Sequence, residues 1–131
     1  MPTTLITICD TCKRDGWDPE TSPVTDGERL AGMVEKQAQG QSTVRTRRHS
    51  CLMGCTHGCN VAIQAEGKIF YVLGRFEPTD EAARGIVEYA VLHSRSGSGQ
   101  VPFRDWPQPI KGHFVSRIPP FPSGPARNQK P

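Results

Sequence analysis

The sequence predicts an α/β domain in the order β-α-β-β-β-α, followed by a proline-rich C-terminal extension. Short β-branched runs alternate with stretches of helical hydrophobic period before residue 98. Eight of the twelve prolines lie after Gly99, which separates the two parts. The 131 residues suffice to bury one modest core without disulfides. We therefore expect a folded domain over residues 1–98 and an extension over residues 99–131.

The first half of the chain predicts a strand, a helix and a second strand. Residues 5–8 are mostly apolar and mostly β-branched, which is typical of a buried strand. Thr25 and Glu28 have the spacing of a capping box at a helix start, and Gly40 is a stop signal. The helix between them has one apolar stripe, made of Leu30, Met33, Val34 and Ala38. Residues 42–48 alternate weakly and predict a second strand, parallel to the first after a crossover.

The second half predicts a hairpin and a second helix. Residues 61–65 and 69–73 are strand-like, with a turn at Glu66 and Gly67. Thr79 is the expected N-cap of the last helix, whose buried stripe consists of Ala83, Ile86, Val87, Ala90 and Val91. This element order is that of a thioredoxin-like layer. Part of the extension should pack on the domain, because it contains the large apolar residues Phe103, Trp106, Ile110, Phe114 and Phe121.

The composition argues against several classes of protein. No apolar run is long enough to span a membrane, and the N-terminus lacks the pattern of a signal peptide. Five cysteines without an export signal indicate the reducing cytoplasm, where thiols bind metal or act in redox chemistry. A net charge of +3 with few aromatic residues gives no reason to expect nucleic-acid binding. No catalytic triad, carboxylate pair or phosphate-binding loop stands out, so we do not expect an enzyme with a small substrate of its own.

The five cysteines stand in two groups. Cys9 and Cys12 form a Cys-x-x-Cys motif at the end of the first strand. Cys51, Cys55 and Cys59 follow later, at intervals of three intervening residues. Thiolates are soft ligands that select zinc, copper(I) or iron–sulfur clusters, and two separated groups are a usual way for a fold to close around such a centre.

Three chemistries fit these cysteines. Four thiolates, two from each group, would hold an iron–sulfur cluster. The same thiolates would hold a zinc ion, with Cys9 and Cys12 as one knuckle and a looser second half. Cys9 and Cys12 alone would exchange thiols and disulfides, although a proline-containing loop, not a helix, follows them directly.

Five stretches of the chain resemble known families. They are residues 8–12 (ICDTC), 51–63 (CLMGCTHGCNVAI), 68–74 (KIFYVLG), 101–104 (VPFR) and 117–120 (RIPP). With these stretches, the whole chain resembles a bacterial family of unknown function described as predicted metal-binding proteins. The cysteine after the first strand, the Cys-Leu-x-Gly-Cys motif, the hairpin and the final helix also resemble the thioredoxin-like 2Fe–2S ferredoxins.

The ferredoxin resemblance implies a 2Fe–2S cluster ligated by Cys9, Cys12, Cys51 and Cys55. Those ferredoxins have a longer loop between their first two cysteines, and they commonly have proline where Cys59 stands. Cys59 is therefore either a spare thiol or an alternative ligand in place of Cys12. His57 is a further alternative ligand, because imidazole replaces thiolate in Rieske-type centres. The ferredoxins often pair, which implies a homodimer. The bacterial family is often met near cobalamin-synthesis genes, which implies electron or metal handling in cobalamin-related metabolism.

A basic run leads into the second cysteine group; it consists of Arg45, Arg47, Arg48 and His49. A four-thiolate 2Fe–2S centre is anionic, so nearby positive charge would stabilise it and raise its reduction potential. The same charges would dock an acidic redox partner. Alternatively, they are the solvated charges of an edge strand, where they prevent association between sheets.

The sequence thus predicts a ferredoxin-like electron carrier that serves a redox partner protein. One alternative is a protein that binds or delivers zinc or cobalt on the same cysteines. Another is a thiol–disulfide oxidoreductase that uses Cys9 and Cys12.

Overall fold

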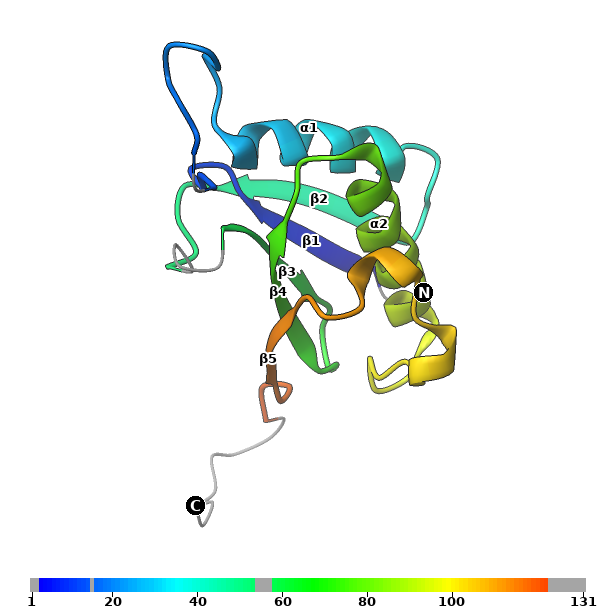
Figure 1. Cartoon of the computed structure of the whole chain (residues 1–131). Helices are drawn as coiled ribbons and strands as arrows, with labels where there is room; N and C mark the ends of the chain where they lie inside the picture. Colours follow the sequence, from blue (N-terminus) through cyan, green and yellow to red (C-terminus); the bar gives the residue numbers. More distant parts are fainter. Residues whose placement is uncertain (1–2, 15, 54–57, 123–131) are drawn as a thin grey trace.

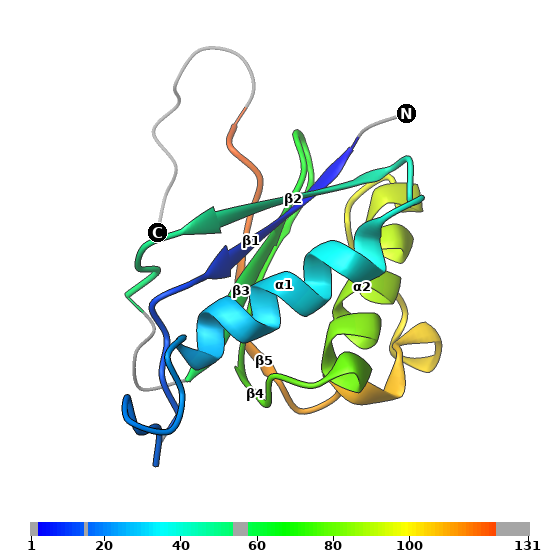
Figure 2. The same cartoon turned by 90° about the horizontal axis from the view of Figure 1, so that it is seen from above.

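The computed structural model describes residues 3–14, 16–53 and 58–122. In these residues one mixed sheet has the strand order β2-β1-β3-β4-β5, and two helices lie together on one of its faces (Figures 1 and 2). The strands are β1 (Thr4–Cys9), β2 (Val44–His49), β3 (Cys59–Gln64), β4 (Phe70–Phe76) and β5 (Phe114–Ile118). The helices are α1 (Asp26–Ala38) and α2 (Asp80–Arg95). None of the described helices is long and apolar enough to cross a bilayer.

The predicted α/β order is confirmed. β1 and β2 are parallel and joined through α1, whereas β3 pairs antiparallel with both β1 and β4. The capping box of α1 forms as expected, because the Thr25 hydroxyl accepts from the Glu28 amide and the Glu28 carboxylate accepts from the Thr25 amide. Thr79 caps α2 by accepting from the amide of Ala82 at 3.1 Å.

The core lies between the sheet and the two helices. Ile6 and Ile8 of β1 alternate onto this face and are fully buried, as are Leu30 and Val34 of α1. The predicted stripe of α2 is buried at Ala83, Ile86, Val87 and Ala90, and Val91 packs at its edge. Burial of these apolar side chains is the main source of the stability of the layer.

Part of the C-terminal extension belongs to the sheet, which the sequence did not predict. Two 3-10 turns, η2 (Phe103–Asp105) and η3 (Gln108–Ile110), lead into β5, which pairs antiparallel with β4. Ile110 is fully buried, and Trp106 and Phe114 pack against the core, whereas Phe103 and Phe121 are exposed. The five expected apolar anchors therefore divide into three that pack on the domain and two that face solvent.

The face of the sheet opposite the helices carries polar contacts. Arg47 Nε donates to Thr7 Oγ1 at 2.7 Å, and Gln64 Oε1 accepts from both side chains. These contacts leave Thr7 only 1% exposed although no helix covers it. β2 is an edge strand and carries three arginines, so charge protects this edge against pairing with another sheet.

Candidate metal centre

Cys9 and Cys12 lie together at the carboxyl end of β1. Cys9 is the last residue of the strand, and the two side chains are 2% and 5% exposed. The Cys12 thiol donates a hydrogen bond to the Cys9 sulfur, so the two sulfur atoms are neighbours. The two cysteines of the Cys-x-x-Cys motif therefore lie side by side as free thiols.

The N-terminal turn of α1 holds the loop that carries Cys12. The Gly27 amide donates to the Cys12 carbonyl at 2.9 Å, and the Arg14 amide donates to Asp26 Oδ2 at 2.7 Å. The Thr25 hydroxyl donates to the Asp10 carbonyl. The first amides of a helix have no hydrogen-bond partner within the helix, so the loop supplies the acceptor that the Gly27 amide would otherwise find in water.

Gly27 makes this contact possible because it has no side chain. A Cβ atom at this position would lie well inside 3.0 Å of the Cys9 carbonyl oxygen and 3.1 Å from the backbone of Asp10. No real Cβ atom keeps such a distance from backbone that cannot move aside. The close contact between the helix and the cysteine loop therefore requires glycine at position 27.

The environment of Cys9 favours the thiolate. Burial raises the pKa of Cys9, but hydrogen bonds from the Cys12 thiol, the Thr11 hydroxyl and the backbone amides of Leu52 and Thr11 outweigh burial and lower it overall. Such donors stabilise negative charge on sulfur. The Leu52 amide also shows that the second cysteine group reaches Cys9, since Leu52 follows Cys51 directly.

Cys12 is the neutral partner of this pair. Burial, first, and the hydrogen bond to Cys9 together raise the pKa of Cys12 to about 12, against the opposing effect of the Asn60 backbone amide. Asn60 is 1% exposed, and its Nδ2 donates to Cys12 Sγ at 3.0 Å and to the Gly58 carbonyl at 2.8 Å. A bound metal cation would favour the thiolate form of Cys12, and the N–H group of Asn60 would stabilise that negative charge.

Cys51 lies at the edge of this group. It is half-buried, and its sulfur accepts from the Met53 amide at 3.3 Å. Met53 has φ +61°, so the chain turns sharply after Cys51. Cys55 and His57, expected as a ligand and an alternative ligand, lie outside the described residues.

Cys59 belongs to the core. It begins β3, pairs with Phe76 of β4 and is fully buried. Burial, first, and the negative charge of Asp26 together raise the pKa of Cys59 to about 12. Its pKa also responds to charge on Cys9, so this thiol lies near the site although it packs with apolar neighbours.

The basic run of β2 makes contacts of its own. Arg48 forms two 2.8 Å hydrogen bonds to the Glu35 carboxylate of α1, and this contact raises the pKa of Arg48 and lowers the pKa of Glu35. Arg47 is bound to Thr7 and Gln64, and Arg45 is exposed. His49 alone adjoins the cysteines, through contacts of its Nδ1 with the backbone of Cys51. Tuning of a cluster by these charges stays a prediction.

The described residues contain no group of three or more His, Cys, Asp or Glu side chains arranged to hold a metal ion. The described part of the site therefore consists of the Cys9–Cys12 pair, the Cys51 loop beside it and several N–H donors aimed at sulfur. This donor set fits a thiolate-bound centre, because N–H groups stabilise thiolate ligands and neutral thiols have little need of them.

Comparison with protein families identifies the chain. A family described as "Protein of unknown function (DUF1636)" matches residues 6–120, which run from β1 through β5. The chain belongs to the DUF1636 family. No curated protein matches it. Among solved structures, this DUF1636 chain is similar to a thioredoxin-like [2Fe–2S] ferredoxin from Aquifex aeolicus, with a TM-score of 0.55 and 15% identity over 89% of this chain and 94% of that one. This likeness confirms the thioredoxin-like fold predicted from the element order.

The sequence missed three residues that shape this DUF1636 site. Asn60 and Gly27 are buried beside the cysteines, and Leu52 contributes only its amide. Asn60 carried a signal that could have found it, because a polar residue directly after a cysteine at the start of an apolar strand needs a hydrogen-bond partner if it is buried.

Proposed function

We propose that this protein is a ferredoxin-like electron carrier whose 2Fe–2S cluster is ligated by Cys9, Cys12, Cys51 and Cys55. The observation that supports this most is the set of N–H donors aimed at the sulfurs of Cys9, Cys12 and Cys51. The cluster would supply a one-electron couple.

The chain's own residues would set the properties of that couple. Hydrogen bonds to ligand sulfur withdraw negative charge, and burial of Cys9 and Cys12 excludes water from the same atoms. Asn60 is the side chain best placed for this, through its contact with Cys12. We expect Asn60→Ala to lower the reduction potential, with Gln64→Ala as a control because Gln64 hydrogen-bonds Thr7 and Arg47 instead.

Cys59 would remain a core thiol in this proposal. Its sulfur lies in the hydrophobic cluster between β3, β4 and the helices. The electron would pass to a redox partner protein, and a homodimer and a place in cobalamin-related metabolism are further parts of the proposal that stem from the resemblance alone.

The deciding experiment is a visible absorption spectrum of anaerobically purified protein, with iron and acid-labile sulfide assayed on the same sample. We expect brown protein with equal iron and sulfide that bleaches with dithionite. Cys9→Ser and Cys12→Ser should lose iron and sulfide, whereas Cys59→Ala should keep both. Colourless protein that contains zinc or cobalt and no sulfide would refute electron transfer and favour metal binding or delivery on the same cysteines.

Thiol–disulfide exchange is a second candidate, favoured by the asymmetry of the Cys9–Cys12 pair. Cys9 has the lowered pKa of an attacking thiol, and Cys12 is the buried thiol that follows. Cys9 would attack a partner disulfide and release one thiolate; Cys12 would then displace the second, so the chain loses two electrons and the partner gains two.

This candidate is tested with metal-free, reduced protein and a small disulfide substrate. Reduction that Cys9→Ser abolishes would support it. Inert metal-free protein would rule it out, as the 2% exposure of Cys9 leads us to expect.

A further inference from the structure

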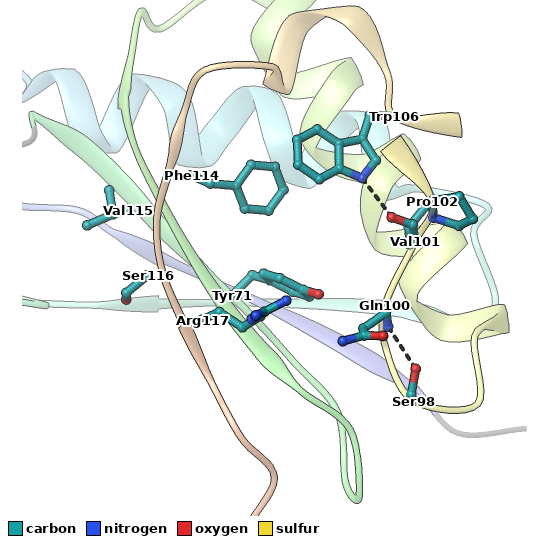
Figure 3. A pocket seen from close by; sticks show the side chains of 10 residues that line it. All are labelled: Tyr71, Ser98, Gln100, Val101, Pro102, Trp106, Phe114, Val115, Ser116 and Arg117. Carbon is teal, nitrogen blue, oxygen red and sulfur yellow. Dashed lines mark hydrogen bonds between the residues drawn. The ribbon is translucent and has the colours of Figure 1, made fainter. Parts of the chain in front are cut away.

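A large hollow lies between the C-terminal extension and the sheet. It has a volume of about 660 Å³ and is lined by β4, β5 and the segment after α2 (Figure 3). Ligand pockets in proteins commonly measure about 300–1,000 Å³. None of the described cysteines lines it, so the hollow is separate from the described part of the candidate metal centre.

One side of the hollow is aromatic and rigid. The rings of Trp106 and Phe114 stack with centroids 4.5 Å apart, and Tyr71 meets Phe114 edge-on at 5.4 Å. The indole is fixed because Trp106 Nε1 donates to the Val101 carbonyl at 2.8 Å (Figure 3). Trp106 and Phe114 are only partly buried, so a flat apolar ligand would remove aromatic surface from water at little cost in side-chain order.

The other side carries polar groups that are available to a ligand. Figure 3 shows Arg117 and Gln100 near Tyr71, across from Trp106 and Phe114. Within the described part of the chain, the Arg117 guanidinium has no ion pair or hydrogen bond, and neither do the Gln100 carboxamide and the Ser116 hydroxyl. Among the described residues that line the hollow, Arg117 is the only charged one, so no described lining residue neutralises it.

We propose that this hollow binds a small aromatic carboxylate. The ring would lie against Trp106 and Phe114, and the carboxylate would receive the paired N–H groups of Arg117, with Gln100 and Ser116 as further hydrogen-bond partners. A planar guanidinium matches a carboxylate with two parallel hydrogen bonds, which a neutral ring substituent cannot match. The hollow thereby adds a ligand-binding role to the chain that does not depend on the cysteines.

The test is a titration of ¹⁵N-labelled full-length protein with 2-naphthoate, followed by NMR. 2-Naphthamide serves as the uncharged probe of the same shape. We expect naphthoate to shift the amides of residues 98–101 and 114–117 and to bind at least about tenfold more tightly than naphthamide, since hydrogen bonds to charged groups are the stronger ones. Arg117→Gln should remove that preference.

Arg104→Gln is the matched control, because Arg104 is an exposed arginine of η2 that does not line the hollow. Equal affinity for both probes in the wild-type protein would overturn the proposal without any variant. So would an effect of Arg104→Gln as large as that of Arg117→Gln, or shifts spread over surfaces remote from the hollow. None of these readouts depends on a metal, so the result is independent of the proposed electron transfer.

Discussion

Substitution of Gly27 by alanine tests the contact that joins α1 to the cysteine loop. Alanine is the better helix former by up to about 1 kcal/mol, so the change would stabilise an ordinary helix. At Gly27, however, the new methyl would collide with the Cys9 carbonyl and the backbone of Asp10, neither of which can rotate away. The helix and the loop must move apart, which also weakens the bond from the Gly27 amide to the Cys12 carbonyl.

The expected size follows from these opposing effects. Overpacking in a closed site costs about 1–3 kcal/mol, and a lost hydrogen bond costs about 1 kcal/mol. After subtraction of a gain of about 1 kcal/mol in helix propensity, we expect Gly27→Ala to lower the free energy of unfolding by about 1–3 kcal/mol. Urea denaturation followed by far-UV circular dichroism measures this value.

Gly32 provides the matched control. It lies in the same helix and is exposed, and a Cβ atom there would have no neighbour within 4 Å. Gly32→Ala should therefore stabilise the protein by up to about 1 kcal/mol. Thiol reactivity of Cys9 and Cys12 should rise in Gly27→Ala and stay unchanged in Gly32→Ala. If both substitutions stabilise the protein alike, α1 does not press on the cysteine loop and our account of the site is wrong.

Three further predictions concern the stability of the fold. Thr25→Ala should cost about 1–2 kcal/mol and more than Thr79→Ala, because the Thr25 hydroxyl also binds the Asp10 carbonyl; equal losses in urea denaturation would contradict this. Burial lowers the pKa of His93 in the folded state, so the unfolded chain takes up a proton first as the pH falls. Below about pH 6.5 the free energy of unfolding should therefore decrease, by at most about 1.4 kcal/mol per pH unit. Denaturation at several pH values should show a weaker decrease for His93→Gln, and an unchanged slope would exclude His93 as the source of the pH dependence. Lys68→Met should cost about 1–3 kcal/mol, because Lys68 Nζ donates to two carbonyls at the end of α2, at 3.0 and 2.7 Å; an unchanged urea midpoint would show that these bonds contribute nothing.

Much of the fold could be predicted because its signals are local. The capping box at Thr25, the N-cap at Thr79 and the turn of the hairpin each depend on a few neighbouring residues, and all three form as expected. β5 could not be predicted in this way. Its residues follow a proline-rich segment and become a strand only by pairing with β4, a contact set by tertiary packing.

In the candidate site, too, local features could be predicted from the sequence and long-range contacts could not. Adjacency of Cys9 and Cys12 follows from their spacing, whereas the Asn60 contact with Cys12 spans 48 positions and cannot be read from either segment alone. The pairing of Arg48 with Glu35 is likewise long-range. The charge of Arg48 therefore lies against α1, whereas its position directly before the cysteine loop predicts a charge beside the cysteines.

The bonds between α1 and the cysteine loop also have a consequence for local opening. Because the amides of Gly27 and Arg14 donate across this junction, neither can exchange its hydrogen with solvent unless the helix start and the loop separate. Fraying of the first helical turn and exposure of the cysteines would then be one event with one free energy. The exchange rates of these two amides would report how often Cys9 and Cys12 become accessible, in protein that carries no metal at all.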